Sequence, residues 1–426
     1  MYNEHIKLLG GEHMLISYKF KNFCSFDQEA EFDLLAPANK VKNRFPDNYI
    51  QTDAGYDILK TAVVIGENAG GKTNFINSLF FLKSLFENNK VVRAHKGLIN
   101  INHTDIPSDK KPCTPQEFDI QVVGNTGTTY HYKLQIDEYC IVSEEFSYKK
   151  DKSSREKIVL FLERDKIDIK DVDKRITINV NYDLSVKNSK REIEEIYARP
   201  THSNENVGLF ITKIALLGDE HAMEFISWMN DRLIVESQSS DYSLYREWQN
   251  VEEDVRIIED PRFLDILRMV DYSICDIEID EEKPFRNSRI VRKTKAGKSF
   301  SRELKSDSGG VREFFAWAVQ LFRVVYEDKV IFADEMDRVI NPILAERIVA
   351  FINGKEHRGQ FIFSSHNVLH LDLKNYMKEQ IYFVTKNRDS LNSELYSLAD
   401  FPEIRYETAK VYEFYMKGIL GGTAFE

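Results

Sequence analysis

The order of apolar and polar residues changes along the chain, and these changes predict where strands and helices lie. Apolar and polar side chains alternate over residues 15–20, 30–34, 117–123, 130–136 and 141–148. A period of two residues is typical of strands that bury one face. We therefore expect a mixed, largely antiparallel sheet in the N-terminal part, surrounding a single βα unit.

The pattern becomes helical from about Lys190 to Arg268, and from Phe314 onward strands alternate with helices. Strands that alternate with helices are typical of parallel βα units. The helical stretch is predicted to be an inserted region whose apolar residues form a core of their own, without the sustained heptads of a coiled coil. The predicted parts are an N-terminal lobe at 14–175, an inserted, mostly helical region with a basic hairpin at 176–300, and a C-terminal lobe at 301–426.

A glycine-rich loop follows the apolar run that begins at Val63. From Gly66 to Thr73 the sequence fits the phosphate-loop pattern G-x-x-x-x-G-K-[ST], and an amphipathic helix is predicted after it. In such a loop, backbone N–H groups surround the β-phosphate, Lys72 reaches the β and γ oxygens, and the Thr73 hydroxyl binds Mg²⁺. The residues predicted to bind the nucleotide here are Gly66, Glu67, Asn68, Ala69, Gly70, Gly71, Lys72, Thr73 and Asn74.

Two later strands end in residues that suit hydrolysis of the bound nucleotide. The apolar run 330–333 ends in Asp334 and Glu335. Beside a phosphate loop, Asp334 is expected to hold Mg²⁺ together with Thr73, and Glu335 to orient and deprotonate the attacking water. A following strand at 360–365 ends at His366, whose position suggests contact with the γ-phosphate. The predicted catalytic residues are Glu335, His366 and Lys72, and the predicted metal ligands are Thr73 and Asp334.

A third element, Ser308-Gly309-Gly310, stands at the start of a predicted helix. A serine and two glycines at a helix N-terminus form a nest of N–H groups that can bind an anion. Taken alone, the same residues are ordinary helix capping. Their position in the sequence, between the phosphate loop and the strand that ends in Asp334, favours the anion-binding interpretation.

These elements, in this order, resemble the head of ATP-binding-cassette (ABC) ATPases, in the branch shared with SMC and Rad50 proteins. The resemblance implies an α/β fold: a P-loop NTPase with an ABC-type head, a mixed sheet and an inserted helical region, which binds ATP and Mg²⁺. More narrowly, segments 21–26, 66–73, 307–310 and 415–423 resemble the AAA/ABC-type ATPases of bacterial abortive-infection and phage-defence operons, similar to the RloA and OLD families.

The resemblance also implies roles for residues outside the main motifs. Asn22 and Ser25 would lie beside the bound nucleotide, and Asp337 would belong to a loop that crosses a dimer interface. Ser308 and Gly310 of one protomer would contact the γ-phosphate held by Lys72 of another, which gives a two-fold homodimer around two ATP molecules.

The chain departs from the family pattern at several points. Asp307 stands where the transporter signature has leucine, and Val311 replaces its usual glutamine. Gln116 and Gln121 are candidates for the glutamine loop. The residues after His366 are too few for the Toprim nuclease domain of OLD proteins, so nuclease or toxin action would need a separately encoded effector.

The net charge of −11 disfavours a grip on nucleic acid by the protein as a whole. A local basic patch runs from Lys283 to Lys305, where Glu303 is the single acid. A solvated hairpin with charged edges explains this patch about as well as a nucleic-acid surface does, and both interpretations stay open.

Composition bounds the location of the protein. No apolar run approaches the roughly 18 residues of a membrane span, and the N-terminus lacks the features of a signal peptide. We therefore expect a cytoplasmic protein without a membrane partner. The scattered cysteines predict neither disulfides nor a zinc site and are expected to be core thiols; they are Cys24, Cys113, Cys140 and Cys275.

Three functions are compatible with these features. The leading one is an ATPase that dimerises around ATP and switches or scaffolds an effector in antiviral defence. The alternative is a Rad50/SMC-like DNA-binding maintenance ATPase that uses the basic patch. A nucleotide-binding structural subunit with little turnover is the third.

Overall fold

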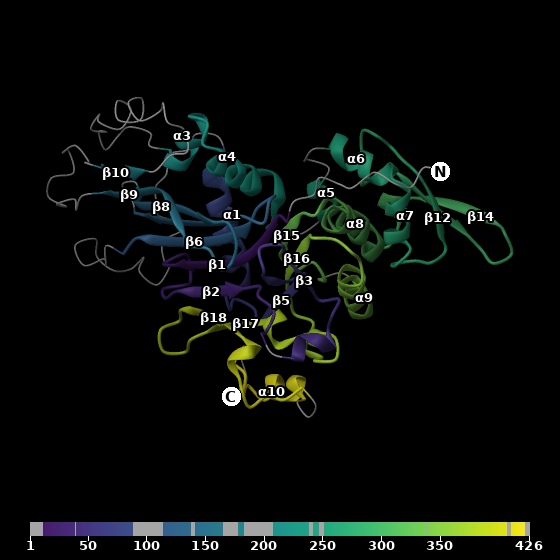
Figure 1. The fold of residues 1–426 in the computed structure, drawn as a ribbon. Coiled ribbons are helices and arrows are strands. Elements are labelled where there is room, and N and C mark those ends of the chain that lie inside the picture. The colour runs from purple at the N-terminus through teal and green to yellow at the C-terminus, as the bar shows by residue number, and fades with distance from the viewer. Residues whose placement is uncertain are drawn as a thin grey trace.

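The computed structural model describes residues 12–38, 40–87, 114–137, 141–164, 178–182, 208–237, 242–246, 251–338, 340–406 and 410–421. Within these ranges the chain forms two large sheets, a small projecting sheet and helices on both faces of the second large sheet (Figure 1). Cys113 and Cys140, the helical pattern before residue 208 and the end of the segment 415–423 lie outside them.

The first large sheet has seven strands in the order β10-β9-β8-β7-β6-β1-β2, and all neighbours are antiparallel. The largely antiparallel sheet predicted for the N-terminal part is therefore confirmed, but it does not surround the predicted βα unit, whose strand belongs to the second large sheet. Its strands are β1 (Met14–Lys21), β2 (Ala30–Asp33), β6 (Gln116–Val123), β7 (Thr129–Ile136), β8 (Ile141–Lys149), β9 (Lys157–Arg164) and β10 (Ile178–Tyr182).

The second large sheet has six strands in the order β11-β15-β16-β5-β17-β18. Only the last pair is antiparallel. The carboxyl ends of the parallel strands therefore meet at one edge, where α/β proteins bind their ligands. The strands are β11 (Leu233–Glu236), β15 (Val330–Ala333), β16 (Gln360–Ser365), β5 (Thr61–Gly66), β17 (Ile381–Lys386) and β18 (Ser393–Ser397).

The parallel strands are buried on both faces, which explains their continuous apolar runs. In β5, Ala62 and Val64 belong to one hydrophobic core, whereas Val63 and Ile65 belong to the other. Helix α1 (Lys72–Phe86) packs in the first core. Helices α8 (Gly309–Glu327) and α9 (Pro342–Asn353) pack in the second. The helix after the phosphate loop and the helix that Ser308 precedes thus cover opposite faces of one sheet (Figure 1).

The described part of the helical stretch, from residue 208 on, does not form the separate core expected from its sequence. Helices α3 (Phe210–Leu216) and α4 (Glu220–Ser227) join the first core, and α6 (Val251–Glu259) and α7 (Pro261–Leu267) join the second. The reason is strand β11, which lies between these helix pairs in sequence and enters the parallel sheet beside β15. The boundaries at 175 and 300 stay a proposal about domain organisation.

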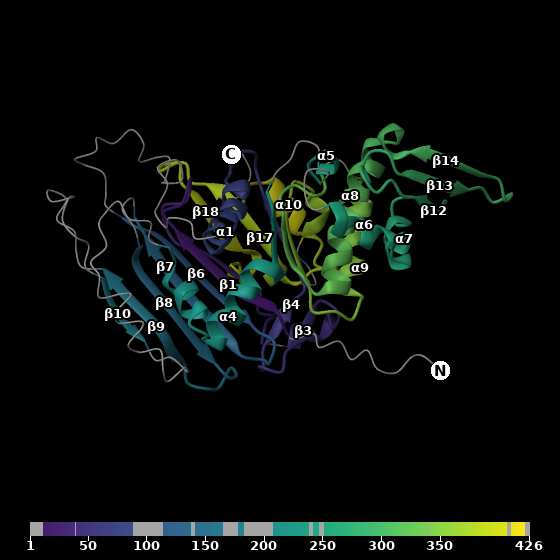
Figure 2. The same ribbon diagram turned by 90° about the horizontal axis from the view of Figure 1, so that it is seen from above.

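Strands β12 (Ile274–Glu278), β13 (Arg289–Lys293) and β14 (Ser299–Glu303) form an antiparallel sheet that projects from the end of the molecule opposite β9 and β10 (Figure 2). The basic patch lies mainly on its β13–β14 hairpin, which leads through a short helix at 304–306 into α8. The other regular elements are β3 (Tyr49–Gln51), β4 (Asp57–Leu59), α5 (Tyr242–Arg246) and α10 (Val411–Met416), the short helices η1 (Lys40–Arg44), η6 (Leu304–Ser306), η7 (Val368–Leu371), η8 (Lys378–Gln380) and η9 (Leu398–Asp400), and the π-helical turn η5 (Trp228–Arg232).

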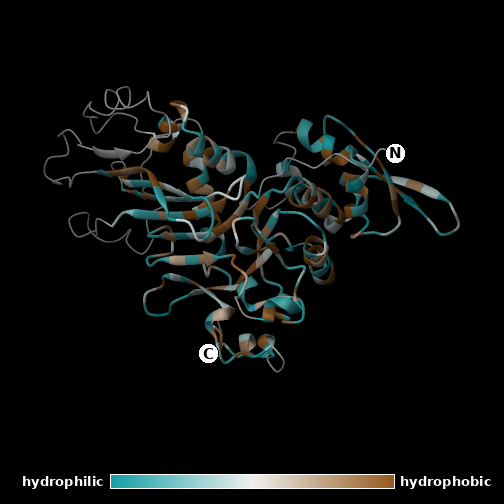
Figure 3. Ribbon diagram, viewed as in Figure 1, coloured by the Kyte–Doolittle hydropathy of each residue, from teal (hydrophilic) through white to brown (hydrophobic). Residues whose placement is uncertain are grey.

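Hydrophobic residues follow the central strands and the inner helices, whereas the projecting sheet is mostly polar (Figure 3). None of the described helices combines the length and the apolar character that spanning a bilayer requires.

Candidate nucleotide-binding and hydrolysis site

The phosphate loop leaves the buried strand β5 and turns sharply into α1. A Cβ atom at Gly66 would overlap the backbone carbonyl oxygen of Val384, and Gly71 has φ of 122°. Side chains other than hydrogen are strongly disfavoured at both positions. Asn68 and Ala69 form an exposed tip, and Ala69 adopts φ of 60°. The loop geometry therefore accounts for two of the glycines in the motif.

Lys72 lies across this loop and is almost fully buried. Its Nζ donates to the carbonyl oxygens of Gly66 at 2.9 Å and Glu67 at 3.0 Å. Burial lowers the pKa of Lys72, while the carboxylates of Glu335 and Asp334 act in the opposite direction. The ammonium group therefore sits between the loop and the acidic strand end, as a phosphate ligand requires.

The structure brings the predicted metal ligands into contact. Thr73 Oγ1 donates to Asp334 Oδ2 at 2.8 Å, and Ser364 Oγ donates to the other carboxylate oxygen at 2.6 Å. The same Ser364 hydroxyl accepts a hydrogen bond from the Glu335 N–H at 2.8 Å. One serine at the end of β16 thus connects the two acidic residues at the end of β15.

Glu335 and His366 face each other beside this cluster. His366 Nε2 lies 3.5 Å from Glu335 Oε1, and both side chains are accessible, at 44% and 22%. Glu335 adopts φ of 48°, which is uncommon for a residue with a side chain and is typical of functional sites. The Glu335 carboxylate is therefore accessible to solvent at the end of β15.

Ser25 and Asn74 meet at the base of the phosphate loop. Asn74 Nδ2 donates to Ser25 Oγ at 2.8 Å, and Ser393 Oγ donates to the Gly70 carbonyl at 2.5 Å and lies 2.7 Å from Ser25 Oγ. Ser393, at the start of β18, was not identified from the sequence. No local motif marks it, because it reaches the loop only through the pairing of β17 with β5 and β18.

The Asn22 side chain makes its hydrogen bonds to the segment before β6 rather than to the phosphate loop. Its φ is 53°, and its Nδ2 donates to the carbonyl oxygens of Thr114 at 2.6 Å and Pro115 at 3.4 Å. These bonds attach the segment before β6 to the end of β1. The side chain thus holds backbone in this structure, and its contact with a nucleotide stays a prediction.

The signature residues lie at the N-terminus of α8. Ser308 is the N-cap and accepts a hydrogen bond from the Val311 N–H at 3.4 Å. Ser308 and Gly309 are exposed and Gly310 is half-buried. Among the hydrogen bonds between described residues, none connects this nest to the phosphate loop, which belongs to the helix on the opposite face of the sheet.

Asp307, the departure from the usual leucine, has a structural role. Its carboxylate lies 2.7 Å from Arg292 Nη2, and the Arg292 Nε donates to Asp271 at 2.7 Å. The side chains of Asp307 and Arg292 are only 5% and 9% exposed. The residue before Ser308 is therefore joined to strand β13 of the basic hairpin by a buried ion pair.

The two glutamine-loop candidates lie away from the site, because Gln116 and Gln121 are on β6 of the antiparallel sheet. Strand β11 is parallel to β15 and ends at the same sheet edge, where Ser237 Oγ donates to Asn77 Oδ1 of α1 at 2.6 Å.

The donor set suits Mg²⁺ bound together with a nucleotide. No group of three or more His, Cys, Asp or Glu residues among the described residues could hold a metal ion by itself. Thr73 and Asp334 offer one hydroxyl and one carboxylate, which is the small protein contribution typical of Mg²⁺ on a nucleoside triphosphate.

The phosphate loop after β5, the acidic end of β15 and the open nest on α8 define the protein as a P-loop NTPase of the AAA/ABC type. The family described as "AAA domain, putative AbiEii toxin, Type IV TA system" matches residues 62–372. The match covers more than half of the chain, and the protein belongs to this family. No match was found among curated protein sequences.

The chain is also similar to solved structures of SMC heads. One, an SMC head bound to the C-terminal winged-helix domain of ScpA, is 13% identical with a TM-score of 0.45, covering 90% of this chain and 97% of that chain. The SMC head domain from Thermotoga maritima is 12% identical with a TM-score of 0.42, covering 90% and 98%. An Smc head with an extended coiled coil, bound to the C-terminal domain of ScpA derived from Pyrococcus furiosus, is 14% identical with a TM-score of 0.43, covering 90% and 96%.

Proposed function

We propose that this chain hydrolyses ATP, closes into a two-fold homodimer around it, and thereby switches or scaffolds a separately encoded effector in antiviral defence, as the resemblance to RloA and OLD ATPases implies. The observation that carries the proposal is the contact series from Thr73 through Asp334 and Ser364 to Glu335, with His366 facing Glu335. The series brings together, at one sheet edge, the side chains that we propose as metal ligands, general base and phosphate sensor.

The roles of the residues follow from their chemistry. Lys72 would bind the β- and γ-phosphates, and Thr73 and Asp334 would hold Mg²⁺, which neutralises phosphate charge when bound. Glu335 would accept the proton of the attacking water. His366, within reach of Glu335, would donate a hydrogen bond to the γ-phosphate. Loss of that phosphate on hydrolysis would remove the contacts that favour the closed dimer.

The position of the signature supports a dimer. The nest at Ser308 is exposed and belongs to a helix on the opposite face of the sheet from α1. A second protomer related by a two-fold axis could therefore present its nest to the ATP that Lys72 holds, and the reverse contact would follow by symmetry.

A defence role is supported by the family description, which names a toxin and a toxin–antitoxin system. The projecting sheet β12–β14 offers a route for an output, because Arg292 connects β13 to Asp307 beside the signature. Closure around ATP would thus move or fix the part of the molecule that extends furthest from the two large sheets.

Mixing two inactive variants tests the shared site. Ser308→Arg blocks the nest and leaves the phosphate loop of the same chain intact, whereas Lys72→Ala disables the loop and leaves the nest intact. One of the two composite sites in a heterodimer then escapes both lesions. We expect the mixture to regain part of the wild-type ATPase activity, up to about half per heterodimer if the two sites act independently.

Two further results complete this test. Each variant alone should be inactive, and Ser308→Arg should still show a rise in melting temperature with ATP because its loop binds nucleotide. No recovered activity, with heterodimers verified by mass, would mean that the signature acts elsewhere or that both sites must fire together.

The alternative, a DNA-binding maintenance ATPase, is favoured by one observation. At the tip of the β13–β14 hairpin Lys293, Lys295 and Lys298 are all exposed, whereas Arg289 and Lys305 have acidic partners. Duplex binding through three lysines would give a slope of about −3 in log affinity against log salt concentration, since each neutralised phosphate contributes roughly −0.9. Binding that is independent of salt, or unaffected by charge reversal of the three lysines, would exclude this function.

A further inference from the structure

A buried histidine, His370, lies next to the proposed interface loop, and neither the motifs nor the proposed hydrolysis assigns it a role. It belongs to η7, four residues after His366, and has no exposed surface. Its Nδ1 lies 2.7 Å from Glu346 Oε1, and its Nε2 lies 3.4 Å from Asp337 Oδ2. The imidazole therefore stands between two carboxylates, each on its own nitrogen.

Asp337, the carboxylate beside Nε2 of His370, lies next to the proposed nucleotide site. Asp337 follows Glu335 by two residues, and its Oδ2 also accepts a hydrogen bond from Ser365 Oγ at 2.5 Å. Ser365 directly precedes His366. Asp337 is thus held from two sides by the segment that carries the proposed phosphate sensor, and its side chain is 6% exposed.

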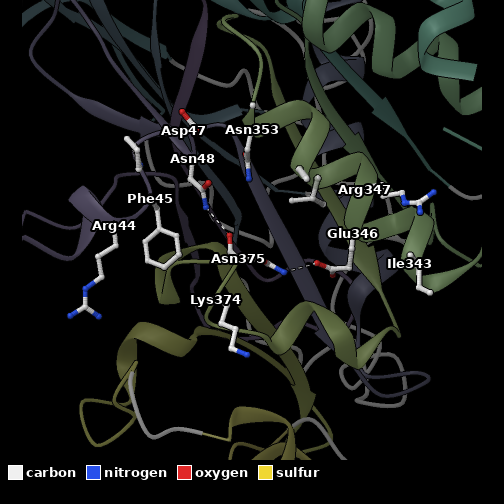
Figure 4. Close-up of a pocket in the computed structure, with 14 residues that line it drawn as sticks. Arg44, Phe45, Asp47, Asn48, Ile343, Glu346, Arg347, Asn353, Lys374 and Asn375 are labelled. Carbon is white, nitrogen blue, oxygen red and sulfur yellow. Dashed lines mark hydrogen bonds between the residues drawn. The ribbon is translucent and has the colours of Figure 1, made fainter. Parts of the chain in front are cut away.

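Glu346, the carboxylate beside Nδ1 of His370, lies on helix α9. Asn375 Nδ2 donates to Glu346 Oε2 at 3.3 Å, and the Asn375 carbonyl accepts from Asn48 Nδ2 at 2.9 Å. Both bonds are visible in the wall of a pocket of about 470 Å³ between α9 and the loops around residues 45 and 374 (Figure 4). Glu346 is therefore anchored to the body of the protein, whereas Asp337 lies on the loop after β15.

The surroundings of His370 favour its charged form. The groups that face it are the carboxylates of Asp337 and Glu346, the Tyr376 hydroxyl 2.8 Å from Nδ1, and the edge-on ring of Phe363. Burial alone would lower the pKa of His370, but the two carboxylates raise it above the ordinary value. The surroundings of the buried His357 favour its neutral form instead. Burial lowers the pKa of His357 to about 4, and its Nε2 bonds a backbone carbonyl.

We propose that His370 is a positioning residue that clamps the loop 334–338 to α9 through Asp337 and Glu346, and so sets the loop for contact with the second protomer. The contribution to closure rests on the proposed ATP-driven dimer, whereas the clamp itself exists in a single chain. The contact with Asp337 restrains the loop directly, and the contact with Glu346 holds the imidazole in place for it. His370 acts through Asp337 and has no contact with the nucleotide of its own.

Two conservative variants separate the two contacts. In His370→Gln the side-chain amide nitrogen occupies nearly the place of Nε2 and keeps a donor toward Asp337. In His370→Asn the amide nitrogen replaces Nδ1, so the donor toward Glu346 stays and the one toward Asp337 is lost. We expect amide hydrogen exchange over 334–338 in the nucleotide-free protein to be roughly tenfold to a hundredfold faster in His370→Asn than in His370→Gln.

A pH series adds a readout that a purely structural role would not change. The charged clamp is present below the raised pKa of His370 and is lost as pH rises through it. Protection of 334–338, corrected for intrinsic exchange, should therefore fall with rising pH in the wild type and stay flat in His370→Gln. His357→Asn is the matched control, since it alters a buried histidine without a carboxylate contact on this loop and should leave 334–338 unchanged.

The same variants are then tested for ATP-dependent dimerisation by sedimentation velocity. Weaker dimerisation in His370→Asn, with an unchanged ATP-dependent rise in melting temperature, supports the proposal. Equal exchange over 334–338 in the two His370 variants and the wild type would overturn it whatever the dimerisation shows. A wild type that never dimerises with ATP, but shows the exchange difference, would instead overturn the proposed closure and leave the clamp standing.

Discussion

Ser364 provides the sharpest test of how the site is assembled, because it contacts both acidic residues without being a predicted ligand or base. It is fully buried at the end of β16, donates to Asp334 Oδ1 at 2.6 Å and accepts from the Glu335 N–H at 2.8 Å. Ser364→Ala removes both bonds and leaves the strand intact. We expect Glu335 to leave its position, since its φ of 48° is then no longer held by this bond.

The magnitude follows from the two lost contacts. A buried N–H without a partner costs about 1–3 kcal/mol, and a hydrogen bond to a carboxylate contributes about 1.5–3 kcal/mol. The free energy of unfolding should therefore fall by about 2.5–6 kcal/mol. Displacement of a general base should reduce kcat by roughly a hundredfold or more. ATP affinity should change much less, because Lys72 keeps its contacts with the loop.

Steady-state ATPase measurements and urea denaturation check these two effects. The matched control is Ser78→Ala on α1, which also removes two hydrogen bonds from a fully buried serine, one to the Phe75 carbonyl and one from Tyr18. It should lower stability and leave kcat unchanged. If Ser364→Ala loses stability but hydrolyses ATP at the wild-type rate, the serine does not position the base and the reasoning is refuted.

Three further predictions concern single side chains. Glu335→Gln should bind ATP, hydrolyse it roughly a hundredfold or more slowly and accumulate a dimer, which turnover assays and sedimentation check; wild-type turnover would reassign the base. Lys72→Ala should abolish the ATP-dependent rise in melting temperature, and an unchanged rise would exclude the phosphate-loop assignment. Burial raises the pKa of Glu144 to about 7 from 4.5, although the Phe210 and Ile211 N–H groups oppose this. The folded state therefore holds the extra proton, and the free energy of unfolding should fall by about 3 kcal/mol as pH rises from about 4.5 to 7. Glu144→Gln should flatten that slope in denaturant titrations, and a slope equal to that of the wild type would refute the assignment.

The parts of the fold predicted from the sequence are those with strong local patterns. The apolar runs at 330–333 and 360–365 became β15 and β16, because strands buried on both faces need continuous apolar residues. Helix α8 begins at Gly309, where the serine cap and the glycines indicated a start. The alternating segments near the N-terminus became neighbouring strands of one antiparallel sheet.

The parts that were missed depend on contacts between distant residues. Strand β11 is short and lies between helices, so its pairing with β15 had no local signal, and the helices around it were wrongly expected to form their own core. Ser393 meets Gly70 across more than three hundred residues of sequence. His370 was not singled out because its two carboxylate partners come from different elements. Periodicity describes one element at a time, and these contacts are set by how the elements pair.

The ion pair between Arg292 and Asp307 bears on how this head can be recombined with others. If the signature were replaced by the leucine-led version of transporters, Arg292 would lose one of its two acidic partners in a position that is 9% exposed. A buried arginine that loses a partner is strongly destabilising, typically by several kcal/mol. Signature and hairpin should therefore be inherited together, and a chimaera that exchanges one without the other should fold poorly even though both pieces come from working ATPases.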